Sequence, residues 1–280
     1  MQSDLLPRKE AAAYAGMTVN FLLDSGEINP VRIGSRLLFR KNELDEWKRN
    51  RSERTYELGI SEYAKCLDFA LAMHYRGYTP VDWGTSRRRE AGQTIANWTR
   101  GQLGEIAVQR FLKDKFDTIV ELDFELHGAI VPHDIIGVVE HGATRPPRLN
   151  VAIKATKFRN SYLILGASEV ELPARRSDVY VLTRVDLPDD HLMRISKATL
   201  SELLKGQTHS RTYLDKVLDF QLVKCEVVGF CNVDELVRVE DKAKLARILG
   251  TQNVSGYRYV RTSGQLHSKR EEWDTVVNHL

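Results

Sequence analysis

The chain has 280 residues, a formal net charge of +3, and 42% hydrophobic and 28% charged residues. This composition is that of a folded globular domain, and no apolar run approaches the roughly 20 residues that a membrane-spanning helix needs. The N-terminus lacks the apolar segment of a secretory signal, and the 3 cysteines form no CxxC pair, which argues against a zinc knuckle. We therefore expect a cytoplasmic protein without a membrane partner, whose small positive charge permits nucleic-acid binding without requiring it.

The first 50 or so residues are predicted to form a small helical unit with one hairpin. A first helix ends at Gly16, and Thr18 is the expected N-cap of a second, short helix. The segment 31–40 (VRIGSRLLFR) is typical of two strands joined by a tight turn. Asn42 is the expected cap of a last helix that carries a tryptophan.

This order of elements resembles the excisionase-type winged helix-turn-helix of the MerR-like group. The resemblance covers about fifty residues, LPRKEAAAYAG through LDEWKR, and implies binding to double-stranded DNA. Thr18 and Asn20 begin the second helix, where side chains can meet base edges. Arg32, Arg36 and Arg40 are spaced along the hairpin, where they can reach phosphates or the minor groove. The alternative is a small interaction module whose arginines are merely solvated.

Beyond this unit, the polar segment 50–60 reads as a linker, and we divide the chain into domains at 1–52 and 53–280. A helical lead-in over 60–100 is expected, with one helix at 61–76 and a second over 86–113. Further helices are expected at 196–206, 232–250 and 269–280. The basic run Arg87–Arg89 at the start of the second helix is either solvated or a DNA contact.

Most of the second domain reads as strands. Segments rich in β-branched residues lie at 118–124, 133–140, 149–157, 162–166, 178–186, 222–230 and 257–261. Strands with helices at both ends predict a mixed α/β fold.

Three short motifs in this domain carry chemistry. GQLGE ends at Glu105 on an amphipathic helix, PHDIIG places Asp134 at the entry to an apolar strand, and VAIKA places Lys154 inside the next strand. In this order they resemble the PD-(D/E)XK nuclease superfamily, whose pattern is a helix acid, then Asp, then a strand bearing Glu or Gln two residues before Lys. The resemblance spans about residues 60–280 and implies a restriction-endonuclease-like mixed sheet flanked by helices.

These residue types suit phosphodiester hydrolysis. A divalent cation polarises the phosphoryl group and lowers the pKa of a bound water, and Mg²⁺ prefers carboxylate, carbonyl and water oxygens. The resemblance makes Asp134 the best candidate ligand, with Glu105 and the carbonyl of Ile153 as further ligands and Mn²⁺ as a substitute metal. Lys154 would orient the attacking water or offset charge on the phosphate.

One position departs from the superfamily pattern, because Ala152 stands where Glu or Gln is expected and alanine binds no metal. We favour an engineered active-site substitution. A carboxylate that has migrated to Glu169 or Glu171, and a degenerate domain that only binds, are the alternatives.

The sequence therefore predicts a DNA-binding, Mg²⁺-dependent endonuclease, impaired at Ala152 and homodimeric, since cutting both strands needs two sites. The resemblance implies a role in restriction or in defence against foreign DNA. The alternative is a non-catalytic transcriptional or recombination regulator with a degenerate nuclease fold. Metal dependence discriminates between the two.

Overall fold

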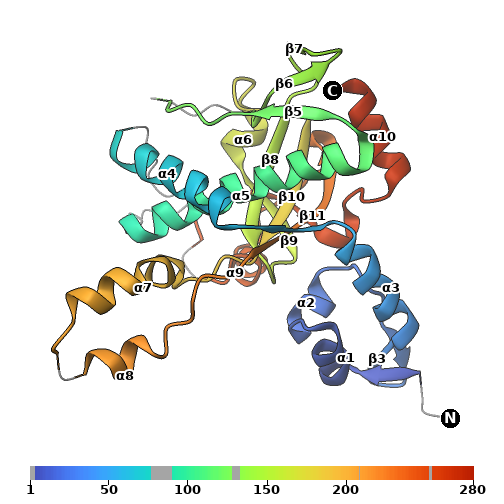
Figure 1. The fold of residues 1–280 in the computed structure, drawn as a ribbon. Helices are drawn as coiled ribbons and strands as arrows, with labels where there is room; N and C mark the ends of the chain where they lie inside the picture. Colours follow the sequence, from blue (N-terminus) through green and yellow to red (C-terminus); the bar gives the residue numbers. More distant parts are fainter. Residues whose placement is uncertain (1–3, 77–89, 128–132, 208, 252–253) are drawn as a thin grey trace.

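The computed structural model describes residues 4–76, 90–127, 133–207, 209–251 and 254–280 (Figure 1). They form a mixed α/β structure with several sheets, which confirms the predicted class. The basic run Arg87–Arg89 lies outside the described residues. Within the described ranges, no helix combines the length and the apolar character needed to cross a membrane.

The N-terminal unit contains three helices and a three-stranded sheet of order β1-β3-β2. Its elements are β1 (Leu5–Pro7), α1 (Arg8–Ala15), α2 (Val19–Asp24), β2 (Val31–Ile33), β3 (Arg36–Arg40) and α3 (Lys41–Ser52). Gly16 ends α1 with a φ of 67°, and the Thr18 hydroxyl caps α2 by accepting the Phe21 N–H at 3.1 Å, as predicted. The prediction for Asn42 is wrong: α3 begins at Lys41, directly after β3, so Asn42 lies inside the helix.

The segment 50–60 is not a linker. Helix α3 runs on to Ser52, and β4 (Thr55–Leu58) then pairs antiparallel with β11 (Val223–Asn232). Its polar sequence hides two buried side chains, Arg51 and Leu58. Arg51 is buried because it pairs with Glu226 of β11 at 2.6 Å, an interaction that the local sequence does not reveal.

The central sheet has the order β4-β11-β10-β8. β8 (Val151–Lys157) and β10 (Val179–Val185) are parallel, whereas β11 is antiparallel to β10. The long helix α5 (Ala91–Phe116) lies across one face of this sheet, with α4 (Ile60–Arg76) packed against it and α10 (Arg270–His279) near its C-terminal end (Figure 1). The main core between α5 and the sheet includes Leu103, Ile153, Val181 and Trp273.

A second, three-stranded sheet continues the first. It contains β5 (Ile119–Leu122), β6 (Ile135–Glu140) and β7 (Ala143–Arg145), with β6 in the middle. The Asp134 N–H donates to the Val151 carbonyl at 3.1 Å, which joins the start of β6 to the start of β8. The predicted loop GATRPPR therefore holds a strand of its own, β7.

The other face of the central sheet is covered by a third sheet and a short helix. The elements are β9 (Tyr162–Gly166), α6 (Ala167–Glu171), η1 (Val233–Glu235), β12 (Val237–Val239), β13 (Arg258–Thr262) and η2 (Ser263–Gln265), and α9 (Lys242–Leu249) packs beside them. The prediction of one helix over 232–250 is wrong. Val237 and Val239 are β-branched and pair with β13, and Asp241 begins the separate helix α9 by accepting the Lys244 N–H.

Helices α7 (His191–Leu203) and α8 (Ser210–Leu214) form an arm that extends away from the body (Figure 1). The helix predicted at 196–206 overlaps α7, which begins five residues earlier and ends three residues sooner.

A buried charge network fastens the N-terminal unit to the central sheet. Arg184 of β10 is fully buried and pairs with Glu27, in the loop after α2, and with Glu226 of β11. The same Glu27 accepts the indole N–H of Trp47 at 2.7 Å. Together with the Arg51–Glu226 pair, these contacts give the N-terminal unit one fixed position on the body.

Candidate functional site

Asp134 is held at the junction of two strands. It directly precedes β6, and its Oδ2 accepts the backbone N–H of Ile153 in β8 at 2.5 Å. This bond, with the backbone bond to Val151, fixes Asp134 beside the strand that carries Lys154. Asp134 and Lys154, which the sequence predicted to act together, therefore lie on neighbouring strands.

Glu105 lies on the face of α5 that packs against the sheet, and only 6% of it is exposed. The close approach of α5 explains this burial: a Cβ on Gly104 would lie 2.3 Å from Thr183 Oγ1 and 2.9 Å from Ala155 Cβ. Gln102 Nε2 donates to Glu105 Oε1 at 3.0 Å. Glu105 Oε2 and Gln102 Oε1 are both buried and have no hydrogen-bond partner among the described residues. Glu105 is therefore a buried carboxyl group with one unsatisfied oxygen, and the interpretation of it as an exposed helix charge does not hold.

The two carboxylates repel each other in a dry environment. Burial raises the pKa of Glu105 well above its usual range, and Asp134 and Asp123 raise it further. Burial also raises the pKa of Asp134, to about 6, although Lys154 and the Ile153 N–H oppose this effect. Without a bound metal ion, these shifts favour the neutral, protonated form of the two carboxyl groups, and one side-chain cation acts on both of them.

Lys154 provides that one cation. Its Nζ lies 2.7 Å from Oε1 of Glu169 on α6. Burial disfavours the charge on Lys154, but Glu169 and Asp134 outweigh it and raise the pKa of the ammonium. Burial acts against the charge of Glu169 too, and Lys154 lowers its pKa in spite of it. Both groups are therefore charged at neutral pH.

Ala152 is 1% exposed and belongs to the apolar cluster that includes Leu163, Tyr180 and Leu182. Strand alternation places it on the same face as Lys154, as expected. Of the two glutamates considered as replacements, Glu169 pairs with Lys154, whereas Glu171 accepts hydrogen bonds from two tyrosines, Tyr257 and Tyr259.

Sequence reasoning missed Asp123. Its N–H donates to the Asp134 carbonyl at 3.3 Å, its Oδ2 lies 2.6 Å from His127 Nε2, and its charge acts on both Glu105 and Asp134. The sequence does place Asp123 directly after the apolar strand β5, just as it places Asp134 directly before the apolar strand β6. That pattern could have identified it. His133 lies before β6, and its Nδ1 is 3.2 Å from Ser177 Oγ.

The described part of the chain contains no group of three or more His, Cys, Asp or Glu side chains arranged to hold a metal ion. Any cation at this site would therefore rest on two carboxylates, with carbonyl, water or substrate oxygens completing the shell. That is a common arrangement for Mg²⁺.

The residues predicted to bind DNA are on the surface of the N-terminal unit. Thr18 and Asn20 are exposed at the start of α2, although the Thr18 hydroxyl is engaged as the helix cap. The other end of α2 faces the body, where Asp24 pairs with Arg247 of α9. The N-terminal end of α2 is therefore the end where the predicted DNA-binding side chains are exposed.

The β2–β3 hairpin, which is the predicted wing, carries a basic hollow of about 460 Å³ that Arg8, Arg32 and Arg36 line together. None of the three makes an ion pair with another described residue, whereas Arg40 pairs with Glu43 at 2.7 Å. Arg8, at the start of α1, was not predicted. Its position becomes apparent only when β1 pairs with β3.

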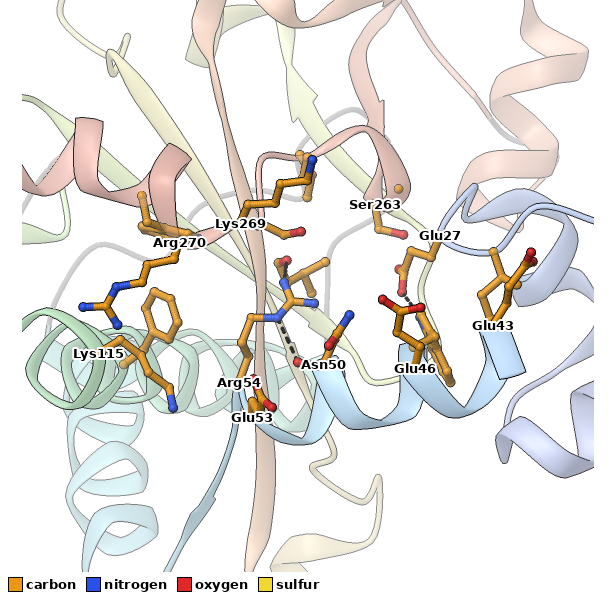
Figure 2. Close-up of a pocket in the computed structure, with 18 of the residues that line it drawn as sticks. Glu27, Glu43, Glu46, Asn50, Glu53, Arg54, Lys115, Ser263, Lys269 and Arg270 are labelled. Atoms are coloured by element: carbon orange, nitrogen blue, oxygen red, sulfur yellow. Dashed lines mark hydrogen bonds between the residues drawn. The ribbon is translucent and has the colours of Figure 1, made fainter. Parts of the chain in front are cut away.

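The cleft in Figure 2, of about 740 Å³, lies between α3, the end of α5 and the start of α10. Lys115 and Arg270 lie at one end, Lys269 and Arg54 lie in the middle, and Glu27, Glu43 and Glu46 lie at the other end (Figure 2). None of the residues predicted for catalysis lines it.

Comparison with known proteins gives no further identification, because no family model, no curated protein and no solved structure matches this chain.

Proposed function

We propose that this protein is a metal-dependent endonuclease that acts on DNA. The observation that carries the proposal is the convergence of Glu105, Asp134 and Lys154, from α5, the start of β6 and β8, into one interacting group. These are the three residues that the nuclease resemblance predicts, on a helix, at the entry to a strand and within the next strand, and the charges of Asp134 and Lys154 both act on Glu105. Buried, mutually repelling titratable groups are typical of functional sites.

The residues present fit a divalent cation. Two buried carboxylates repel each other, and Glu105 Oε2 has no hydrogen-bond partner among the described residues, so a bound cation would relieve both costs. Glu105 and Asp134 would hold Mg²⁺ or Mn²⁺, and the Ile153 carbonyl remains a predicted third ligand. When bound, the cation would polarise the scissile phosphate and favour deprotonation of a water.

Lys154 supplies the complementary positive charge. Because its ammonium is already held by Glu169 at 2.7 Å, its position is fixed before substrate arrives. A preorganised cation stabilises the charge that develops on the phosphoryl oxygens without a reorganisation cost in the reaction.

Glu169 is our candidate for the carboxylate that Ala152 lacks. It reaches Lys154 from α6, whereas Ala152 is enclosed by apolar side chains. A migrated carboxylate would make the chain active as it stands, and an engineered substitution would make activity depend on restoring glutamate at position 152.

The N-terminal unit would anchor DNA through Arg8, Arg32 and Arg36, with Thr18 and Asn20 at the exposed end of α2. Arg40, engaged with Glu43, contributes less than first expected. Homodimerisation and a role in restriction or defence remain predictions of the resemblance.

A non-catalytic DNA-binding regulator is the second candidate. The buried Ala152 favours it, as does the lack of a three-ligand metal cluster among the described residues.

Cleavage of supercoiled plasmid in Mg²⁺ separates the alternatives. The parent chain, Ala152→Glu, Glu169→Gln and Asp134→Asn would be compared at equal protein concentration, with EDTA controls. Activity in the parent that is lost in Glu169→Gln and Asp134→Asn supports the migrated carboxylate. Activity in Ala152→Glu alone supports the engineered substitution. Metal-independent DNA binding by all four proteins, with no cleavage by any, supports the regulator.

A further inference from the structure

Arg100 is a buried cation whose hydrogen-bonding capacity is not filled. Its side chain is 7% exposed, and its Nε has no partner among the described residues. Nη1 donates to Asn97 Oδ1 at 3.1 Å, and Nη2 lies 4.0 Å from Asp189 Oδ1, beyond hydrogen-bond distance. A guanidinium has five N–H donors in a fixed planar arrangement. Several donors of Arg100 therefore lack an acceptor among the described residues and could bind one from a ligand.

Lys157, at the C-terminal end of β8, contacts the same Asp189 carboxylate that lies near Arg100. Its Nζ lies 3.0 Å from both carboxylate oxygens of Asp189. Asp189 therefore bridges Lys157 and Arg100, yet its side chain is 78% exposed. Because exposed ion pairs contribute little to stability, a stronger anion can displace this carboxylate.

A backbone phosphate suits this place. A phosphate diester carries one negative charge shared by two non-bridging oxygens, and these can accept hydrogen bonds from the planar fork of arginine and from the lysine ammonium together. The carboxylate reaches the lysine but stays 4.0 Å from the arginine.

Arg100 also lies on the helix that carries Glu105. The two residues are five positions apart on α5, about 7.5 Å along the helix axis. One bound nucleic acid could therefore extend from the carboxylate site to Arg100.

We propose that Arg100 and Lys157 bind a backbone phosphate of the nucleic acid, away from the scissile bond, and that Asp189 occupies this site in the free protein. The proposal rests on the proposed function, because it requires that nucleic acid lies across the carboxylate site.

The test is DNA affinity rather than cleavage. Fluorescence anisotropy of a labelled 20-base-pair duplex, in EDTA and over a series of salt concentrations, would compare the parent with Asp189→Asn and Lys157→Gln. Asp189→Asn is expected to bind about threefold to tenfold more tightly, because the competing carboxylate is neutralised. Lys157→Gln is expected to bind more weakly by a similar factor, with the slope of log affinity against log salt reduced by about one.

Asp219→Asn is the matched control. Asp219 is 87% exposed and pairs with Lys197 at 3.1 Å on the arm, so the substitution changes net charge and an ion pair in the same way but at another place. Its affinity is expected to stay within about twofold of the parent. Arg100→Lys, which keeps the charge and removes the fork, should weaken binding, with thermal unfolding used to verify folding.

Equal affinities for Asp189→Asn and Asp219→Asn would overturn the proposal, as would parent-like binding by Lys157→Gln. If the parent binds DNA in either of these cases, the proposed function stands and only the Arg100–Lys157 site is lost. A parent that binds no DNA at all would overturn both.

Discussion

Arg184 in the central sheet and Glu27 in the N-terminal unit are 157 residues apart and form a buried ion pair at 2.5 Å. The Arg184 side chain is fully buried, and its second partner, Glu226, is shared with Arg51. The N-terminal unit is thus fixed to the central sheet by charges that solvent does not screen.

Glu27→Gln is expected to lower the free energy of unfolding by about 3 kcal/mol, because it leaves Arg184 buried with a single shared carboxylate. Urea unfolding at neutral pH measures this. Asp24→Asn is the control: its partner Arg247 is 71% exposed, so the change should cost about 1 kcal/mol or less. Equal losses in the two variants would contradict the importance of the buried network.

The same pair predicts a specific acid sensitivity. Arg184 lowers the pKa of Glu27 from an ordinary 4.5 to about 2, against the effect of burial. A carboxyl with a depressed pKa contributes stability that is fully present above its unfolded pKa and is lost as pH falls through its folded pKa. Between pH 4.5 and 2, the parent should therefore lose more stability than Glu27→Gln. If the urea midpoints of the parent and Glu27→Gln fell in parallel with pH, Glu27 would not be the source of the acid sensitivity.

Gly104 is required for the close packing of α5. In Gly104→Ala, the new Cβ would lie 2.3 Å from Thr183 Oγ1, so we expect a loss of about 1–3 kcal/mol from overpacking. Gly101→Ala is the matched control, since no atom lies within 4 Å of a Cβ there. It should gain up to about 1 kcal/mol from helix propensity. The same sign of change in both thermal unfolding experiments would be inconsistent with this packing.

The buried charge of Asp134 is expected to lower the stability of the folded protein, as is typical of a residue that serves function. Asp134→Asn removes a buried charge that repels Glu105 while keeping an oxygen for the Ile153 N–H. Its unfolding free energy in EDTA should equal or exceed that of the parent, by up to about 1 kcal/mol, whereas Asp134→Ala should lose about 1–3 kcal/mol because the amide is left unpaired. A large destabilisation by asparagine would assign Asp134 a structural role instead.

The wing arginines are expected to bind phosphate rather than bases. Arg32→Gln and Arg36→Gln should each weaken DNA binding to any sequence and reduce the salt slope by about one. Lys205→Gln, at an ammonium-bearing side chain that is 79% exposed on the arm, is the control for net charge. Sequence-dependent losses would instead favour base contacts by the wing.

Local signals allowed local features to be predicted. The glycine that ends α1 and the threonine that caps α2 act through bonds within five residues, so Gly16 and Thr18 were identified correctly. The order of Glu105, Asp134 and Lys154 was also readable, because each motif lies in its own helix or strand.

Features that depend on distant partners were not predictable. Strand β4 was predicted to be a linker because its sequence is polar and its partner strand, β11, lies far away in the chain. The burial of Arg51 at the end of α3 likewise depends on a distant partner, Glu226 of β11. The burial of Glu105 was hidden because a charged side chain on a helix is usually exposed. The pairing of Lys154 with Glu169 rather than with Glu171 likewise depends on how α6 is oriented toward β8.

Binding of Mn²⁺ tests the central claim most directly, because it asks whether Glu105 and Asp134 hold a divalent cation at all. Electron paramagnetic resonance of free Mn²⁺ would be followed during titration into the parent and into Asp134→Asn, at neutral pH without DNA. We predict one Mn²⁺ per chain in the parent and binding at least about tenfold weaker in Asp134→Asn. Identical titrations for the two proteins would contradict a metal site at these carboxylates.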